Sequence, residues 1–226
     1  MSTPPPYDFP FEEARYERAA ILTTKIVRFI DKEFDKKCFE HEIGGYGDEP
    51  PVSGWSALVE GITDSGDCKN LYIMLTTDME IGQAQYFPTE TEDGSDLKVI
   101  ALPFEALRVF GRTVLPARTI SQLFHEVIHH LDYVDELEFD LDTPTGDLCD
   151  DALFRRYVNT PHEQRAYFYQ GVFDMRRSTM IKTAGGLENP RQRERIRKKH
   201  FPYFDIDTLS VGNLAFFEMR FNSLVC

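Results

Sequence analysis

The chain has 226 residues, of which 42% are hydrophobic, and this is enough apolar material to bury a sizeable core. Asp and Glu outnumber Lys and Arg by 38 to 25, which gives a formal net charge of −13. Such a charge disfavours nucleic acid and anionic membranes as the main partners, because both repel an acidic protein at long range. No stretch of the sequence approaches the roughly 20 apolar residues of a transmembrane helix. We expect a soluble, globular protein.

The first ten residues, which include three consecutive prolines, are predicted to form a flexible arm, and one domain is expected over residues 11–226. The N-terminus has neither the basic start nor the apolar run of a secretory signal. Four cysteines lie far apart without a C-x-x-C pair, which fits reduced thiols. These features predict a cytoplasmic protein, with export by a non-classical route as the alternative. They leave the oligomeric state undetermined.

The first half of the chain predicts one helix followed by a small sheet. Leu22, Ile26 and Ile30 recur at helical spacing, and we expect a helix from Phe11 to Cys38. A turn-rich segment follows, and then come short apolar stretches typical of strands. Strands are expected at residues 56–62, 71–77 and 97–103, with a further one at 81–88 and an acidic turn at 89–96.

The second half is predicted to be mainly helical. A helical pattern runs from Pro116 to about Asp135, and an acidic segment with turn chemistry follows at 135–151. Thr160 and Pro161 are a good N-cap and first residue for a helix over 160–177. A basic helix is expected after Asn189, with a solvated face rather than a nucleic-acid site, and the aromatic segment 201–222 should pack on the core. The order of these elements predicts an α+β fold.

The stretch FHEVIHHLD, residues 124–132, carries the clearest chemical pattern in the chain. At about 100° per residue, His125 and His129 lie on one side of the predicted helix, away from its apolar residues. Two imidazoles one turn apart can bind one zinc ion, and Glu126 between them can act as general base toward water. The alternative is an ordinary helix with histidines on a solvated face.

The two polar neighbours of this motif have less certain roles. His130 points about 100° away from His129 and is expected to be a supporting or a surface histidine rather than a ligand. Asp132 is placed to accept a hydrogen bond from a ligand imidazole, although a solvated aspartate fits the pattern almost as well.

A catalytic zinc normally has three protein ligands, so a third must come from another segment. Glu163 is favoured over its neighbour His162, because adjacent helical residues cannot both face one ion. Asp147, Asp150 and Asp151 are weaker competitors. Glu163 also has a simpler explanation, since Thr160 and Glu163 form the pattern of a capping box.

With these residues, the chain resembles the zincin metallopeptidases, and within them the gluzincins, whose third ligand is a glutamate on a downstream helix. HEVIHHLD followed by Y-x-N-T-P-x-E-x-x-A-Y is similar to small stand-alone metallopeptidases of phage and bacterial genomes, over about residues 97–177. The resemblance implies that His125, His129 and Glu163 bind Zn²⁺ and that Glu126 is the general base. It also implies that LKVIALP, residues 97–103, is the edge strand that receives a peptide substrate by strand addition.

The chain departs from this family at two points. Longer gluzincins have an acid four residues after the ligand glutamate, where this chain has Tyr167, so the orienting role falls to Asp132 or stays unassigned. Tyr157 is favoured as the residue that stabilises the transition state, ahead of Tyr167 and His162.

The sequence therefore predicts a zinc metallopeptidase that acts on a peptide or protein. The alternative is a non-catalytic protein, such as a virion or assembly component, that retains a zincin fold.

Overall fold

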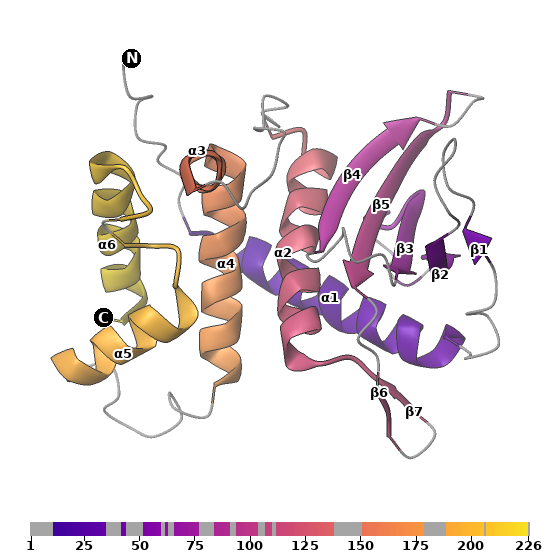
Figure 1. Ribbon diagram of the computed structural model, residues 1–226, viewed down its shortest axis with the longest axis horizontal. Coiled ribbons are helices and arrows are strands. Elements are labelled where there is room, and N and C mark those ends of the chain that lie inside the picture. The colour runs from indigo at the N-terminus through magenta and orange to yellow at the C-terminus, as the bar shows by residue number, and fades with distance from the viewer. Residues whose placement is uncertain are drawn as a thin grey trace. The chain divides into compact units, whose positions relative to one another are not determined.

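In a computed structural model of the chain, the described residues form an α+β structure of six helices and seven strands (Figure 1). By its contacts the chain divides into two compact units, Glu17–Asp135 and the combination of Met1–Tyr16 with Glu136–Cys226. None of the helices in the described part is long and apolar enough to cross a membrane. The structure describes residues 11–34, 42–43, 52–59, 62, 66–76, 84–90, 94–103, 107–109, 112–137, 151–178, 189–205 and 207–225.

The unit Glu17–Asp135 contains a mixed sheet with the strand order β1-β2-β3-β5-β4. The strands β3 and β5 pair in parallel, and the other neighbours pair antiparallel. A separate hairpin consists of β6 (Leu107–Val109) and β7 (Arg112–Val114). The sheet strands are β1 (Glu42–Ile43), β2 (Val52–Leu58), β3 (Leu71–Thr76), β4 (Gln85–Glu90) and β5 (Asp96–Pro103).

The prediction that LKVIALP is an edge strand is wrong. This segment forms β5, which lies between β3 and β4, and four consecutive residues from Val99 to Leu102 are buried. The edge is β4, which has a neighbour on one side only within the described residues, as Figure 1 shows. Pro88 in β4 fits this position, because an edge strand tolerates a residue without a backbone N–H.

Two helices pack on this sheet. In α1 (Glu13–Glu33), Leu22, Ile26 and Ile30 are buried at helical spacing. The ring of Phe29 lies 6.5 Å from that of Trp55 on β2. The other helix, α2 (Ala117–Val134), lies beside β4 and β5 (Figure 1). Its apolar residues Leu123, Phe124, Val127, Ile128 and Leu131 are all fully buried. The helical pattern in the sequence therefore marks the face that builds this core.

The other unit is helical in its described residues, with α4 (Pro161–Arg177) at its core. The rings of Phe168 on α4 and Phe217 on α6 have centroids 6.2 Å apart, and Phe201 lies 5.8 Å from Phe168. This phenylalanine cluster, made of Phe168, Phe201, Phe204, Phe217 and Phe221, is completely or almost completely buried. The remaining helices are α3 (Asp151–Val158), α5 (Pro190–His200) and α6 (Val211–Val225).

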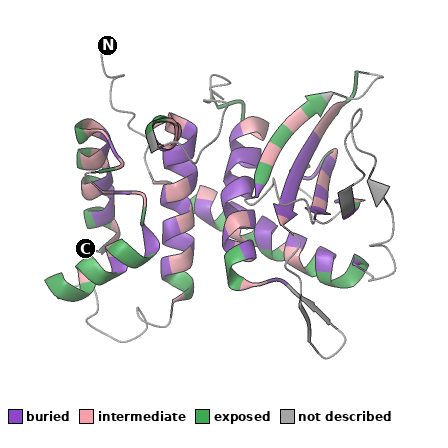
Figure 2. Ribbon diagram, viewed as in Figure 1, coloured by how far each residue is buried: buried purple, intermediate pink, exposed green. Residues whose placement is uncertain are grey.

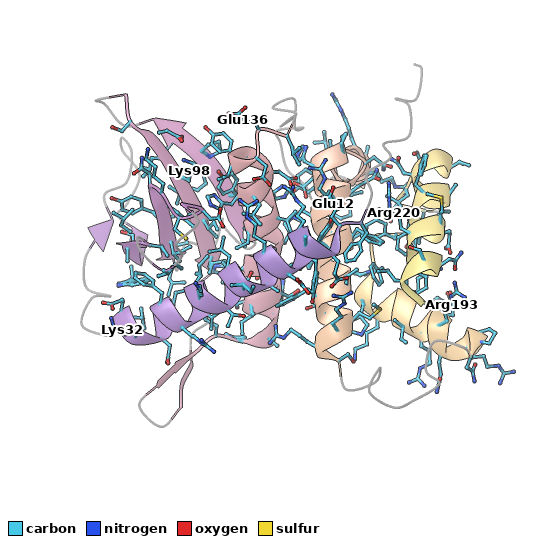
Figure 3. All side chains as sticks on the ribbon, turned by 180° about the vertical axis from the view of Figure 1, so that it is seen from behind. Glu12, Lys32, Lys98, Glu136, Arg193 and Arg220 are labelled. Atoms are coloured by element: carbon cyan, nitrogen blue, oxygen red, sulfur yellow. The ribbon has the colours of Figure 1, made fainter. Side chains whose placement is uncertain are left out.

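Two arginines pack against phenylalanine rings of this unit. Arg193 on α5 and Arg220 on α6, both labelled in Figure 3, each place a guanidinium over a phenylalanine ring. The distances to the ring centroids are 5.7 Å to Phe221 and 5.5 Å to Phe216. Such contacts stabilise a guanidinium against an aromatic face, which matters most for Arg220, since it is only 5% exposed. The predicted packing of the aromatic segment 201–222 is confirmed within this unit, because its phenylalanines in the cluster are buried.

The predicted helices agree closely with the structure where a cap or a proline marks the start. α2 begins just after Pro116, and α4 has Thr160 as N-cap and Pro161 as first residue. The first helix is shorter in the structure, since α1 ends at Glu33. The predicted N-terminal arm, the middle of the acidic segment and residues 35–38 lie outside the described residues.

Candidate functional site

The histidine motif lies in the middle of α2, in a stretch that is buried on all sides. His125 and His129 are only 5% and 4% exposed, although the apolar residues occupy the opposite face of the helix. Figure 2 shows α2 buried along most of its length. The alternative of a solvated histidine face is therefore wrong. Buried ionisable side chains are costly unless they are paired or bind a metal, so this burial requires a chemical explanation.

The two imidazoles point their Nε2 atoms at each other. These atoms are 3.0 Å apart, and the ring planes are inclined by 74°. Two ligands of one tetrahedral zinc lie about 3.3 Å apart, because each zinc–nitrogen bond is about 2.0–2.1 Å long. The observed separation is within a few tenths of an ångström of that value. One turn of helix thus places the two nitrogens at hydrogen-bonding distance from each other, which is also close to the spacing of two ligands of a single ion.

Two carboxylates accompany the histidines on α2. Glu126 is 6% exposed and follows the first histidine directly, while Asp132 is 1% exposed in the last part of the helix. The possibility that Asp132 is a solvated aspartate is therefore wrong. With His130 included, five ionisable residues are thus buried within two turns, which is typical of functional sites rather than of ordinary helices.

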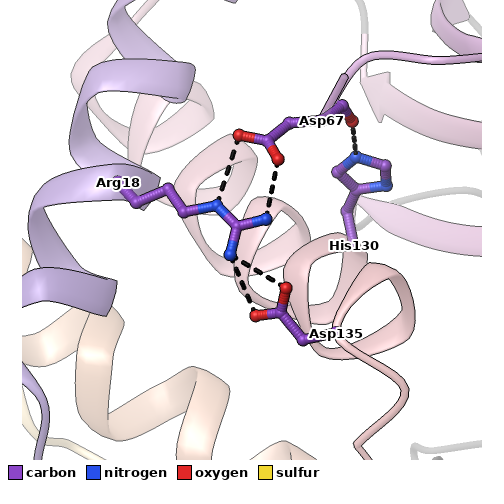
Figure 4. A network of polar contacts seen from close by, with 4 residues as sticks. All are labelled: Arg18, Asp67, His130 and Asp135. Carbon is purple, nitrogen blue, oxygen red and sulfur yellow. Dashed lines mark hydrogen bonds and ion pairs between the residues drawn. The ribbon is translucent and has the colours of Figure 1, made fainter. Parts of the chain in front are cut away.

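His130 belongs to a separate polar network (Figure 4). It is completely buried, so a surface position is excluded, and its Nε2–H donates to the backbone carbonyl of Asp67 at 2.5 Å. The Arg18 guanidinium of α1 binds the Asp67 carboxylate through two nitrogens, at 2.7 and 3.2 Å. The same guanidinium also donates to both carboxylate oxygens of Asp135, just after α2. The network therefore ties α1, the turn before β3 and the end of α2 together.

The charge state of His130 follows from this burial. Burial lowers the pKa of His130 to about 4, against an opposing hydrogen bond to the Asp67 carbonyl. The ring is therefore neutral near pH 7 and acts as a single N–H donor. It also meets the ring of Tyr86 on β4 edge-on, with the centroids 5.6 Å apart. His130 thus supports the helix that carries the motif.

In the helical unit, the start of α4 contradicts the capping-box explanation of Glu163. In a capping box, the Thr160 hydroxyl oxygen would accept a hydrogen bond from the N–H of Glu163, and the Thr160 N–H would donate to the Glu163 carboxylate. Instead, the hydroxyl donates to the Tyr157 carbonyl at 2.8 Å, and the N–H donates to the same oxygen at 3.0 Å. Thr160 makes no side-chain cap bond. Capping therefore does not explain why a glutamate stands at position 163.

His162 and Glu163 are both buried, with 3% and 4% of their surface exposed. His162 Nε2 lies 3.7 Å from Glu163 Oε1, so the two side chains are neighbours. Gln164 and Arg165 next to them are buried as well. The first turn of α4 therefore holds a cluster of buried polar groups, as the middle of α2 does.

The remaining candidates are less informative. Tyr157 on α3 is half-buried, and Tyr167 packs its ring 4.7 Å from that of Tyr203. Asp147 and Asp150 lie outside the described residues, and only the backbone of Asp151 is described. The ion pair between Arg18 and Asp67 could not be predicted from the sequence, because 49 residues separate the two and no local pattern links them.

Comparisons of the chain with known protein families, with curated proteins and with solved structures give no match. A proposal about the function therefore rests on the chemistry of the buried histidine and carboxylate side chains.

Proposed function

We propose that the protein is a zinc-dependent metallopeptidase in which His125, His129 and Glu163 hold the metal. The observation that carries the proposal is the pair of buried imidazoles with Nε2 atoms 3.0 Å apart. Glu163 supports it, since it is buried as the two histidines are, and each of the three residues offers one atom that can bind a metal. Two neutral nitrogens and one carboxylate are the ligand set of many catalytic zinc sites.

The residues fit zinc by their chemistry as well as by their number. Neutral imidazoles keep the positive charge of the ion, and one carboxylate lowers the net charge of the buried group to +1. Three protein ligands leave one position for water or substrate. When bound, zinc supplies a Lewis acid that brings the pKa of coordinated water toward about 7.

Glu126 is the proposed general base. It is buried beside His125, and its carboxylate would take the proton of the attacking water and pass it to the leaving amine. Tyr157 is the proposed donor to the oxyanion of the transition state. We assign Asp132, which is buried near the end of the motif, to orienting a ligand imidazole.

We further propose that β4, rather than β5, receives the substrate. The N–H of Lys98 in β5 donates to Asn70 on the β3 side, and Lys98 is paired with Pro88 of β4. Along an antiparallel pair, hydrogen-bonding residues alternate, so the backbone carbonyl of Pro88 points away from β5. Among the described strands, β4 is therefore the one beside which an extended peptide could add as a further strand.

Turnover of a peptide library by the zinc-loaded protein tests this function. Glu126→Gln should lose cleavage by at least about a hundredfold, because general-base catalysis is worth that much, while it keeps its zinc. Lys32→Met, at an exposed site on α1, is a suitable control and should cleave as the wild type does. Equal cleavage by the wild type and Glu126→Gln would refute the proposed mechanism.

A further inference from the structure

The turn between α3 and α4 is organised around one side chain. The Asn159 amide nitrogen donates to the carbonyl oxygens of Arg155 at 2.6 Å and Thr208 at 2.9 Å. Its Oδ1 accepts from the backbone N–H of Ser210 at 2.9 Å and from Asn213 Nδ2 at 3.0 Å. An asparagine amide has two donor hydrogens and two acceptor lone pairs, so every hydrogen-bonding position is used.

These bonds join segments that are far apart in the sequence. Thr208 and Ser210 lie in the segment before α6, and Asn213 lies in its first turn. The separations from Asn159 range from 49 to 54 residues. Because the amide is planar and bonded on both sides, it fixes the turn relative to the C-terminal segment more firmly than one bond could.

The same residue also reaches into α4 itself. The backbone carbonyl of Asn159 accepts a hydrogen bond from Gln164 Nε2 at 3.2 Å. Gln164 follows Glu163 directly and is 1% exposed. Asn159 is the residue before the N-cap of α4, and the place where this helix starts determines where its first-turn side chains lie.

We infer that Asn159 is a positioning residue for the proposed metal site: its amide holds the first turn of α4, and with it Glu163, against the segment before α6. The inference rests on the proposed function. It also gives a role to the C-terminal segment, which carries none of the assigned site residues. Asn159 does not touch the ion in this scheme and acts through the helix that it holds.

Zinc affinity, measured by competition with a chromogenic chelator, tests the inference without any use of activity. Asn159→Ala should bind zinc about tenfold more weakly, the lower end of the loss expected when a partner that orients a ligand is removed. Asn159→Asp keeps the acceptor oxygen for Ser210 and Asn213, but it places a carboxylate oxygen against the carbonyl oxygens of Arg155 and Thr208. Its zinc affinity should therefore fall at least as far as that of Asn159→Ala.

The matched control is Phe204→Leu in the phenylalanine cluster of the same unit. It should lower the melting temperature at least as much as Asn159→Ala does, because a buried ring is truncated, yet keep the wild-type zinc affinity. If Asn159→Ala does not fold, Asn213→Ala removes one of the four bonds and should weaken zinc binding by about threefold.

The outcomes separate the two proposals. Wild-type zinc affinity in Asn159→Ala, or an equal loss in Phe204→Leu, would overturn the inference and leave the proposed function standing. If only Asn213→Ala folds, an unchanged zinc affinity in that variant would overturn the inference as well. A wild-type protein that binds no zinc would remove the proposed function, and the inference would fall with it.

Discussion

Gly171→Ala should destabilise the protein, although the same change in most helices does the opposite. Gly171 lies inside α4, where alanine is favoured over glycine by about 1 kcal/mol. A Cβ at this position would lie 2.4 Å from two ring carbons of Phe201 and 2.7 Å from the His200 carbonyl oxygen. Neither neighbour can yield easily, because the ring is 2% exposed within the phenylalanine cluster and the oxygen belongs to the backbone.

The magnitude follows from these opposing terms. Overpacking a core costs about 1–3 kcal/mol, and a clash with both a ring and the main chain belongs in the upper part of that range. After the gain of about 1 kcal/mol in helix propensity, we expect a net loss of about 1–2 kcal/mol in the free energy of unfolding. Urea unfolding at pH 7 should show a lower midpoint with an unchanged slope.

A double-mutant cycle with Phe201→Leu provides the control for Gly171→Ala. Leucine removes the ring atoms that the new methyl group meets, so the double variant should lose less stability than the sum of the two single variants. A Gly171→Ala protein that is more stable than the wild type by about 1 kcal/mol would refute the close packing of α4 against Phe201.

Three further predictions concern the network around α2 and the metal. Arg18→Met should lower the free energy of unfolding, measured in urea, by about 2 kcal/mol, because it leaves the buried Asp67 carboxylate without its guanidinium. The loss is limited because the arginine is partly exposed, and the control Lys32→Met should cost almost nothing. Burial holds the pKa of His130 near 4, against 6.5 for an ordinary histidine, with the Asp67 carbonyl and the Lys98 and Arg18 cations facing it. As the pH falls, His130 therefore binds a proton in the unfolded chain before it does so in the folded protein. The chelator-treated protein should lose up to roughly 3 kcal/mol of its free energy of unfolding between pH 6.5 and pH 4. His130→Gln should not show this loss. Chelation should abolish cleavage, and added zinc should restore it, whereas a protein that unfolds on chelation and cleaves nothing when loaded with zinc would favour a structural metal site in a non-catalytic protein.

The helices that carry the candidate residues are predictable because local chemistry marks their starts. Pro116 precedes α2, and Thr160 with Pro161 begins α4, so caps and proline define these boundaries within the sequence itself. The spacing of the two histidines also requires only the helical repeat. These parts of the site depend on neighbours a few residues apart.

The strand order could not be predicted in the same way. The strand β4 precedes β5 in the chain, yet β5 lies between β3 and β4, and its parallel pairing with β3 depends on contacts between distant segments. The family resemblance predicts the edge at LKVIALP. Pro88 is a local signal for a different edge strand, since a proline is tolerated at an edge, but it does not define the strand order.

The burial of the polar residues on α2 could not be predicted from the sequence either. Hydrophobic periodicity identifies the apolar face of α2, but it gives no information on whether the opposite face is covered. The sequence therefore favours a site at His125 and His129 and leaves Asp132 almost as compatible with solvent, but it does not show that these side chains are buried. Similarly, nothing near Asn159 in the sequence indicates that its partners lie some 50 residues away.

Metal analysis of the purified protein tests the central claim most directly. The wild type, Glu126→Gln and His162→Ala should each carry about one tightly bound zinc ion per chain, whereas His125→Ala and Glu163→Ala should carry almost none. Zinc retained at full stoichiometry in Glu163→Ala, or lost in His162→Ala with Glu163 intact, would contradict the assignment of the third ligand. A wild-type protein without zinc affinity would contradict the account as a whole.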